Sequence, residues 1–150
     1  MKTPATKQDA QTALTKLQGF IGPSQLAAVE DGMQGEECQF FFDKVVELAE
    51  IIETMPKTGE QGVDPEKLMI YLHYFAGGRA NFYIMEKDKG CAADTPEQFQ
   101  SQAFGVADLF GDGGEFGYIS IPEILDNGGE LDFYFEPRTL AQQRLENSKK

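Results

Sequence analysis

The clearest pattern in the chain is an apolar stripe with helical spacing between residues 36 and 55. Apolar side chains recur there at steps of three and four positions, at Cys38, Phe41, Phe42, Val45, Leu48, Ala49 and Ile52. Such a stripe predicts a helix that packs one face against a core. The acidic residues of the segment fall away from the stripe and predict an acidic outer face, formed by Asp43, Glu47, Glu50 and Glu53.

The residues before this helix show weaker patterns. Residues 1–18 are polar, with few apolar positions at helical spacing, and we expect them to form a flexible, frayed N-terminal arm. Ser24 is a favourable N-cap for a short helix over residues 25–33. We expect residues 19–147 to form a single α+β domain, because a chain of this length is long enough to bury one core.

From about residue 67 the apolar positions recur with a period of two, which predicts strands. Residues 69–75 and 80–86 read as a hairpin around the turn Ala76-Gly-Gly-Arg79. The first of these strands is apolar on both faces. It is therefore either covered on both sides or part of an exposed aromatic surface. That aromatic surface would consist of Tyr71, His73, Phe75 and Tyr83.

The second half of the chain continues the strand pattern. Three further strands are predicted, over residues 100–110, 115–120 and 131–136. Ser120 and the proline that follows two positions later predict a short helix, and a C-terminal helix follows Pro137. This order predicts an α+β fold, with a mostly antiparallel sheet of about five strands on which N-terminal helices and a C-terminal helix pack.

Charge adds a feature that the element pattern does not show. The chain has 25 acidic residues against 13 lysines and arginines, and its net charge is −12. No lysine or arginine occurs between Lys89 and Arg138, whereas ten acidic residues do: Asp94, Glu97, Asp108, Asp112, Glu115, Glu123, Asp126, Glu130, Asp132 and Glu136. Direct binding to nucleic acid or to an anionic membrane is not expected, because phosphate binding depends on clustered basic residues.

Two interpretations of this acidity stay open. The carboxylates either form a surface that mimics a phosphate backbone and occupies a basic groove on a partner protein, or they serve solubility alone.

The sequence contains no recognisable motif for catalysis, a metal or a cofactor. The glycines at 111, 113, 114 and 117 lack the spacing of a dinucleotide fingerprint because position 116 is Phe116, and no Gly-Lys-Ser/Thr occurs. His73 is the single histidine, and we expect it to be a packing residue of its strand. No pair of cysteines has zinc-site spacing. An enzyme that uses paired carboxylates remains an alternative.

The expected location is the cytoplasm. The N-terminal residues lack the apolar segment of a secretory signal, and no stretch of 18 apolar residues occurs. Cys38 and Cys91 do not form the framework of a disulfide-rich secreted domain.

Three segments resemble a small bacterial domain family of unassigned function. They read QAFGVADLF from Gln102, GEFGYISIPEI from Gly114 and ELDFYFEPRTL from Glu130, and are similar to the family patterns AFGLADL, ELGYISxxEL and xLDLYWxPxxL. The resemblance covers about residues 19–141. It departs at Arg79-Ala-Asn-Phe82, where related chains carry Cys-Asp-Trp. The family has no agreed catalytic residues, and its plasmid- and island-borne members imply a mobile genetic element.

Acidity and resemblance together predict a non-enzymatic acidic binding protein of a mobile genetic element. One specific hypothesis is an anti-restriction or anti-CRISPR inhibitor that acts by protein–protein binding or DNA mimicry. The alternative is an accessory or scaffolding protein that docks through the aromatic hairpin. We expect no cofactor, a protein partner with a basic surface, and a monomer or a dimer. The acidic contact residues of the first hypothesis are Asp43, Glu47, Glu50, Asp108, Asp112, Glu115, Glu123, Asp126, Glu130 and Asp132.

Overall fold

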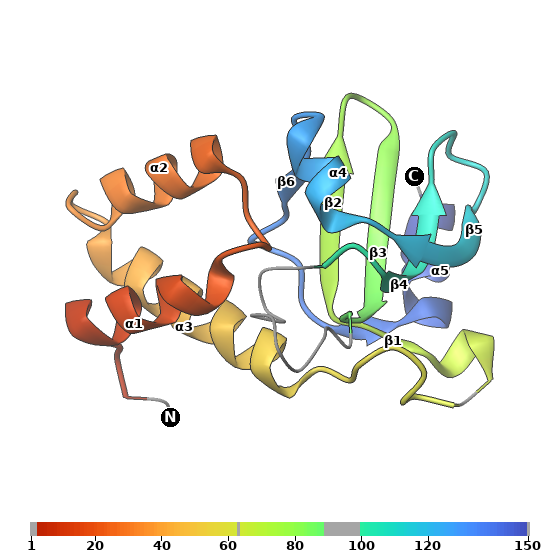
Figure 1. The fold of residues 1–150 in the computed structure, drawn as a ribbon, viewed down its shortest axis with the longest axis horizontal. Helices are drawn as coiled ribbons and strands as arrows, with labels where there is room; N and C mark the ends of the chain where they lie inside the picture. The colour runs from red at the N-terminus through yellow and green to blue at the C-terminus, as the bar shows by residue number, and fades with distance from the viewer. Residues whose placement is uncertain (1–2, 63, 89–99, 150) are drawn as a thin grey trace.

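Three helices come first in the chain and a sheet follows them (Figure 1). The computed structural model describes residues 3–62, 64–88 and 100–149. The helices that precede the sheet are α1 (Lys7–Leu17), α2 (Pro23–Gly32) and α3 (Cys38–Thr54). Antiparallel strands then form a five-stranded sheet and a separate two-stranded pair. The predicted α+β class is therefore confirmed.

Helix α3 forms where the apolar stripe predicts it. The buried positions of this helix are Phe42, Val45, Leu48, Ala49 and Ile52. Gly32, the last residue of α2, lies against the ring of Phe41, and a Cβ atom at this glycine would be 2.3 Å from that ring. The small residue thus allows the end of α2 to approach α3 closely.

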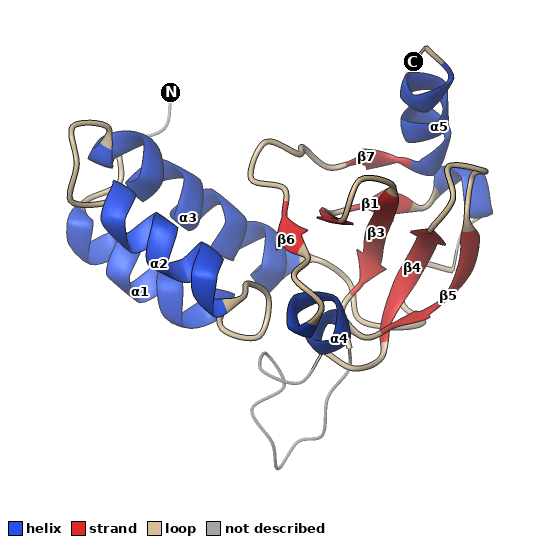
Figure 2. Ribbon diagram, turned by 90° about the horizontal axis from the view of Figure 1, so that it is seen from above, coloured by secondary structure: helices blue, strands red, loops and turns tan. Residues whose placement is uncertain are grey.

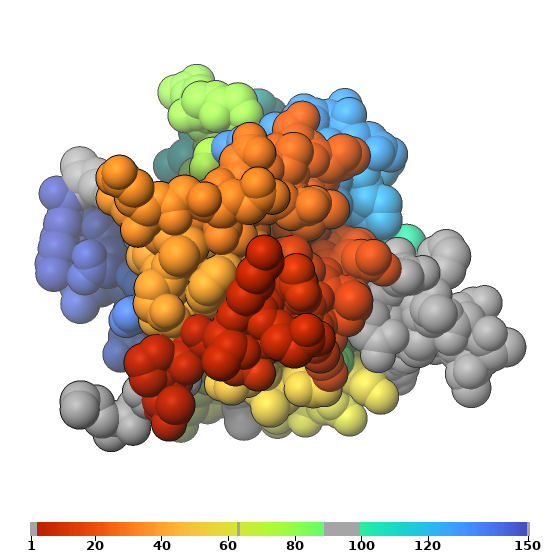
Figure 3. Space-filling view, turned by 90° about the vertical axis from the view of Figure 1, so that its left-hand side faces the viewer, coloured from red at the N-terminus to blue at the C-terminus, as the bar shows by residue number. Residues whose placement is uncertain are grey.

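Helix α1 corrects the expectation that residues 1–18 form a flexible arm. Thr6 and Asp9 make a capping box: the Thr6 hydroxyl accepts a hydrogen bond from the Asp9 N–H at 3.0 Å, and the Asp9 carboxylate accepts one from the Thr6 N–H at 2.9 Å. Figure 3 shows α1 lying against the other two helices. Its buried residues are Ala10, Ala13 and Leu17. Two of the three are alanines, so the buried face appears only as a weak apolar pattern in the sequence.

The five-stranded sheet has the order β5-β4-β3-β2-β6, and all its neighbouring strands are antiparallel. Its strands are β2 (Leu72–Ala76), β3 (Ala80–Glu86), β4 (Ala103–Asp108), β5 (Glu115–Ile119) and β6 (Glu130–Leu131). Helix α4 (Ile121–Asp126) connects β5 to β6, and Ser120 caps it as the sequence predicts. Figure 2 shows α1–α3 at one end of the molecule and β5 at the opposite end.

The chain covers both faces of the central strands. On one face Leu72, Tyr74 and Ile84 join the core of the three N-terminal helices and α4. On the other face Tyr83 and Met85 join a second core that includes residues of β1 (Met69–Ile70) and α5 (Leu140–Ser148). Strand β3 is therefore covered on both sides. On the second face of β2, His73 is only half-buried and Phe75 is exposed, so that strand is covered fully on one face alone.

Three predicted strands are clearly shorter than their sequence patterns. The one expected over residues 100–110 forms only over Ala103–Asp108. The strand expected over residues 69–75 breaks at Tyr71, and β1 leaves the sheet to pair with β7 (Arg138–Thr139). The strand expected over residues 131–136 ends after Leu131. There the Asp132 carboxylate accepts a hydrogen bond from the Tyr134 N–H at 2.9 Å and closes a turn. Polar and apolar side chains alternate over residues 131–136 with the period of a strand, although most of these residues form a turn.

The C-terminal helix is shorter than the sequence predicts but lies in the expected place. It was expected to follow Pro137, and it begins at Leu140 after a capping box of Thr139 and Gln142. A short 3-10 helix, η1 (Pro65–Lys67), packs against it.

Candidate functional site

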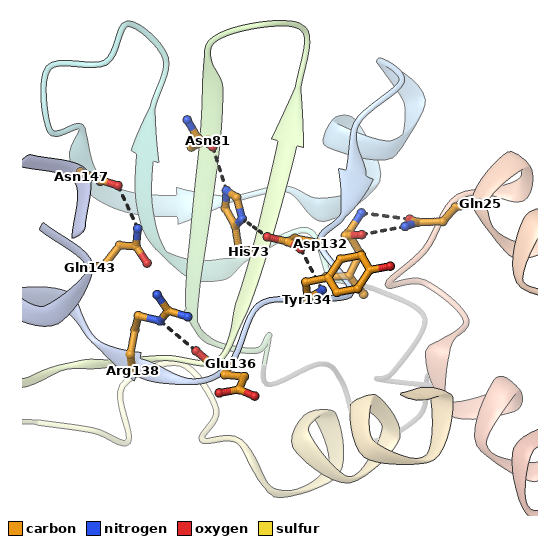
Figure 4. A network of polar contacts seen from close by, with 10 residues as sticks. Gln25, His73, Asn81, Asp132, Tyr134, Glu136, Arg138, Gln143 and Asn147 are labelled. Carbon is orange, nitrogen blue, oxygen red and sulfur yellow. Dashed lines mark hydrogen bonds and ion pairs between the residues drawn. The ribbon is translucent and has the colours of Figure 1, made fainter. Parts of the chain in front are cut away.

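The chain protects one edge of the sheet with a side chain. Gln25 of α2 donates a hydrogen bond from its amide nitrogen to the Leu131 carbonyl at 2.7 Å and accepts one from the Leu131 N–H at 2.9 Å. A primary amide offers the same donor and acceptor as a peptide unit. Gln25 therefore takes the place of a further strand beside β6, as Figure 4 shows.

The opposite edge, β5, directs peptide groups away from the sheet. The Asp132 N–H donates to the His73 carbonyl at 2.8 Å, so the peptide groups of His73 face β6. Peptide groups alternate sides along a strand, and the two residues of an antiparallel pair face each other or face apart. This alternation can be applied in turn to the residue pairs of β2 with β3, β3 with β4 and β4 with β5. It shows that the peptide groups of Gly117 in β5 face β4. The N–H and C=O groups of Phe116 and Tyr118 consequently point outwards, and no described residue hydrogen-bonds to them.

A hollow of about 340 Å³ runs along this open edge. It lies between β5 and the tip of the β4–β5 hairpin, where Leu109 and Phe110 project. The side chain of Phe110 is 71% exposed and that of Tyr118 is 68% exposed. Contiguous exposed apolar side chains of this size are typical of interaction surfaces in soluble proteins.

The charged residues that line this hollow are all acidic. Asp112 and Glu115 belong to it, and a neighbouring hollow of about 340 Å³, which shares Ala107, Tyr118 and Ile119, adds Glu123. The open edge therefore combines unpaired peptide groups, exposed aromatic rings and a negatively charged rim. We call the two hollows and the strand beside them the β5 groove.

Asp108 shapes the hairpin tip from inside. It is 5% exposed, and its carboxylate accepts hydrogen bonds from the N–H groups of Gly111, Asp112 and Gly113 at 2.7, 3.2 and 3.3 Å. Gly111 and Gly113 have φ of 78° and 102°, a backbone region that favours glycine. The N–H groups of the glycine-rich turn thus converge on the Asp108 carboxylate. Asp108 therefore stabilises the turn and does not belong to an acidic surface.

The structure separates the ten predicted acidic contact residues into groups. Asp43, Glu47 and Glu50 lie on α3, at the end of the molecule opposite β5 (Figure 2). Asp43 accepts hydrogen bonds from the Ala5 N–H at 2.8 Å and from Gln39 at 2.9 Å, and Glu47 is 3.2 Å from Lys44. These acids do not form one surface with those of the β4–β5 hairpin.

The exposed acids between β4 and β7 have no cationic partner within the described part of the chain. Six carboxylates of this part of the chain are exposed and pair with no described lysine, arginine or histidine: Asp112, Glu115, Glu123, Asp126, Glu130 and Glu136. Two further acids of the base-free stretch, Asp94 and Glu97, lie outside the described residues.

The aromatic residues predicted as an alternative docking surface are mostly covered. Tyr83 is 5% exposed, Tyr71 packs against the main core, and of the four only Phe75 is exposed. The His73 ring stacks on the ring of Tyr83, with 5.0 Å between centroids, and lies 5.6 Å from that of Phe135. The other exposed aromatic side chains in the strands of this sheet, Phe116 and Tyr118, lie on β5.

His73 is held at both ring nitrogens. Its Nδ1 is 2.9 Å from the Asp132 carboxylate and its Nε2 is 2.8 Å from the side-chain oxygen of Asn81 (Figure 4). The Asn81 amide nitrogen donates to the Arg79 carbonyl at 3.2 Å, which fixes this orientation. Neither nitrogen is left to take a proton from a substrate.

A polar cleft of about 810 Å³ lies between this histidine and α5. Burial raises the pKa of the Tyr83 hydroxyl above its usual value, hydrogen bonding with Asn147 opposes this, and the charge of Asp108 adds to it. The Gln143 side chain is buried, and its oxygen has no hydrogen-bond partner among the described residues. The Asp108 and Asp132 carboxylates that border the cleft are both used in internal hydrogen bonds.

The described residues offer neither a metal site nor a membrane-spanning helix. They contain no group of three or more histidine, cysteine, aspartate or glutamate side chains that would hold a metal ion. Among these residues no helix has the length and apolar character needed to cross a membrane.

Comparison with models of protein families, with curated proteins and with solved structures found no match to this chain.

Proposed function

We propose that this chain is a non-enzymatic binding protein whose partner is a protein with a basic surface. The observation that carries the proposal is the set of six exposed carboxylates between β4 and β7 that have no cationic partner in the described part of the chain. Unpaired charges of one sign raise the local potential and attract a surface of opposite sign. A basic partner supplies the counter-charges that the fold itself does not provide.

The polar cleft beside α5 gives less support to catalysis. A general base needs a nitrogen or carboxylate oxygen within hydrogen-bond reach of its substrate. His73 already contacts an oxygen at each ring nitrogen, and the carboxylates of Asp108 and Asp132 are held by the chain itself. Binding is therefore the activity that we propose.

Two matched variants test the proposal. The first removes four of the six unpaired charges between β4 and β7, by Glu115→Gln, Glu123→Gln, Asp126→Asn and Glu130→Gln. The control removes four exposed charges around α2 and the start of α3, by Glu30→Gln, Asp31→Asn, Glu36→Gln and Glu37→Gln. Both variants have the same net charge. Partners captured from a bacterial lysate by the immobilised wild-type chain are identified, purified and titrated against all three proteins at increasing salt.

We expect the first variant to lower affinity at least tenfold and the control to lower it less than threefold. Salt should weaken binding of the wild-type chain, because a Debye length of about 8 Å at physiological ionic strength shortens to about 3 Å at 1 M. An affinity that ignores salt, or equal losses in both variants, would contradict the proposal.

The resemblance to plasmid- and island-borne chains extends the proposal to a biological setting. In this setting, the partner is a host restriction or CRISPR enzyme, whose nucleic-acid groove is basic. A single DNA-like surface made of all ten predicted acids is not part of the proposal, because α3 and β5 lie at opposite ends of the molecule (Figure 2). Cleavage of plasmid DNA by purified restriction and Cas nucleases, with and without an excess of the chain, checks this setting. Unchanged cleavage across the panel counts against it.

A further inference from the structure

The two edges of the sheet differ in a way that points to a docking mode. At β6 the side chain of Gln25 satisfies both peptide groups of Leu131. At β5 the peptide groups of Phe116 and Tyr118 point outwards and meet no described residue. Proteins usually shield an edge strand with charge, proline, a bulge or a covering segment, because an open edge templates pairing with another chain. Four of the five residues of β5 are uncharged and none is proline.

We propose that an extended segment of the basic partner adds to β5 as a sixth strand of the sheet. This inference rests on the proposed function, because it takes the partner to be a basic protein, and it names how that partner docks. Strand addition gives affinity through main-chain hydrogen bonds and specificity through the side chains that alternate along the added strand.

The backbone of β5 offers four hydrogen-bonding groups to the added strand. They are the N–H and C=O groups of Phe116 and of Tyr118, which stand two residues apart, as a β-ladder requires. Adding a strand at this edge leaves the pairing of Gly117 with β4 intact. The partner segment therefore needs to be only about five residues long to match β5.

The side chains around the edge set the composition of the added strand. Phe104, Phe116 and Tyr118 form an aromatic group on one face of β4 and β5, with centroid distances of 6.2 Å from Phe104 to each of the other two rings. Apolar residues of the partner pack on these rings. The acids of the rim, Glu115 and Asp112, favour lysine or arginine at the remaining positions.

Charge distinguishes this occupant from a second copy of the chain. Two copies paired through β5 would bring together two chains of net charge −12 each, with the acidic rims of both hairpins near one interface. Like charges close together in an interface are destabilising. A basic extended segment meets the same edge with charges of opposite sign.

The experiment uses the full chain and a synthetic peptide of seven residues in which lysine and valine alternate. A second peptide with glutamate in place of lysine is the charge control. Amide hydrogen exchange of the chain is measured by NMR with and without each peptide. We expect the lysine peptide to slow exchange of the Phe116 and Tyr118 amides at least tenfold, and the Gly117 amide, which already faces β4, to change little.

A pair of substitutions at one position then isolates the backbone contribution. Tyr118→Pro removes an outward N–H without removing a hydrogen bond to β4, and Tyr118→Val removes the ring but keeps the N–H. We expect the proline variant to weaken binding of the lysine peptide at least tenfold, and to weaken it more than the valine variant does. Unchanged exchange at Gly117 in the proline variant shows that the sheet is intact.

Three results would overturn the docking mode. They are binding of the lysine peptide without protection of the Phe116 and Tyr118 amides, equal binding of the glutamate peptide, and a stable dimer of the free chain whose formation protects these amides. In the first case the preference for basic partners survives and only the strand addition fails. If neither the lysine peptide nor any basic protein binds, the proposed function fails as well.

Discussion

The side-chain amide of Gln25 makes both hydrogen bonds of a peptide unit with Leu131, a residue 106 positions further along the chain. This pair joins the second helix to the last strand of the sheet. It stops the sheet from growing beyond β6, and it connects the helical end of the molecule to the sheet at a site where the pairing of β6 with β2 is only two residues long.

The Gln25→Ala substitution should destabilise the fold by about 1–3 kcal/mol, because it leaves two half-buried peptide groups of Leu131 without partners. Urea unfolding followed by circular dichroism measures the change. Gln11→Ala, on the exposed side of α1, is the control and should shift stability by less than about 0.5 kcal/mol. Equal effects of the two substitutions would show that the Gln25 amide does not hold the edge.

Gly105 and Gly117 face each other in the β4–β5 pairing and should respond differently to the same change. A Cβ atom at Gly105 would lie 1.9 Å from the Tyr83 carbonyl oxygen, whereas one at Gly117 would meet nothing within 4 Å. Because the obstacle is backbone, Gly105→Ala should destabilise the protein by more than about 2 kcal/mol. Gly117→Ala should be neutral or slightly stabilising. Thermal unfolding of both variants decides, and similar melting temperatures would contradict the prediction.

Tyr74 should make the protein sensitive to high pH. Its ring is completely buried, its hydroxyl donates to the Phe20 carbonyl, and burial raises its pKa well above the usual value. The unfolded chain loses this proton at about pH 10 while the native chain keeps it. The stabilising contribution is therefore complete below about pH 10 and is lost as the pH rises further.

The Tyr74→Phe variant separates the two effects of this hydroxyl. At neutral pH it should be less stable by about 1 kcal/mol, because the Phe20 carbonyl loses its donor. Above about pH 10 its stability should fall less steeply than that of the wild-type protein. Urea titrations on both sides of that pH provide the comparison, with Tyr118→Phe on the exposed edge as the control. Parallel pH profiles for all three proteins would count against the prediction.

His73 and Asp132 should be energetically coupled. Their side chains lie 2.9 Å apart, with about 15% and 26% of their side-chain surfaces exposed. His73→Phe keeps a ring that can stack on Tyr83 and removes the polar contacts, and Asp132→Ala removes the carboxylate. A double-mutant cycle on these two positions should give a coupling energy of about 1–3 kcal/mol. Additivity within about 0.5 kcal/mol would mean that the contact contributes no stability of its own.

The sequence predicted those parts of the fold whose pattern is carried by large apolar side chains. The stripe from Cys38 to Ile52 predicted α3, and the alternation around Leu72 and Ile84 predicted the central hairpin. Helix α1 was missed because alanine, at two of its three buried positions, gives little contrast with its polar neighbours. The turn at Asp132 has a strand-like sequence, because its polar and apolar residues alternate.

The candidate site was predictable only in part. The base-free stretch could be read from the sequence, and it contains the acids of the β5 groove. The sequence does not predict which of those acids is exposed. Asp108 and Asp112 both lie next to the glycine turn, and only the structure shows that the N–H groups of the turn bond to the carboxylate of Asp108. The open edge at β5 is not visible in the sequence either, because strand order depends on pairings between residues far apart in the chain. The one local signal is a short, uncharged run at Phe116–Ile119, separated from the glycine turn by Glu115 alone.

The carboxylate of Asp108 inside the glycine turn affects how much conformational entropy is lost on docking. Because three N–H groups converge on it, the hairpin tip is already rigid before any partner arrives. The backbone of the hairpin tip is therefore preorganised, and little backbone entropy is lost when it becomes part of an interface. A partner strand would bear most of the ordering itself, so stiffening that strand, rather than this hairpin, is the way to tighten the complex.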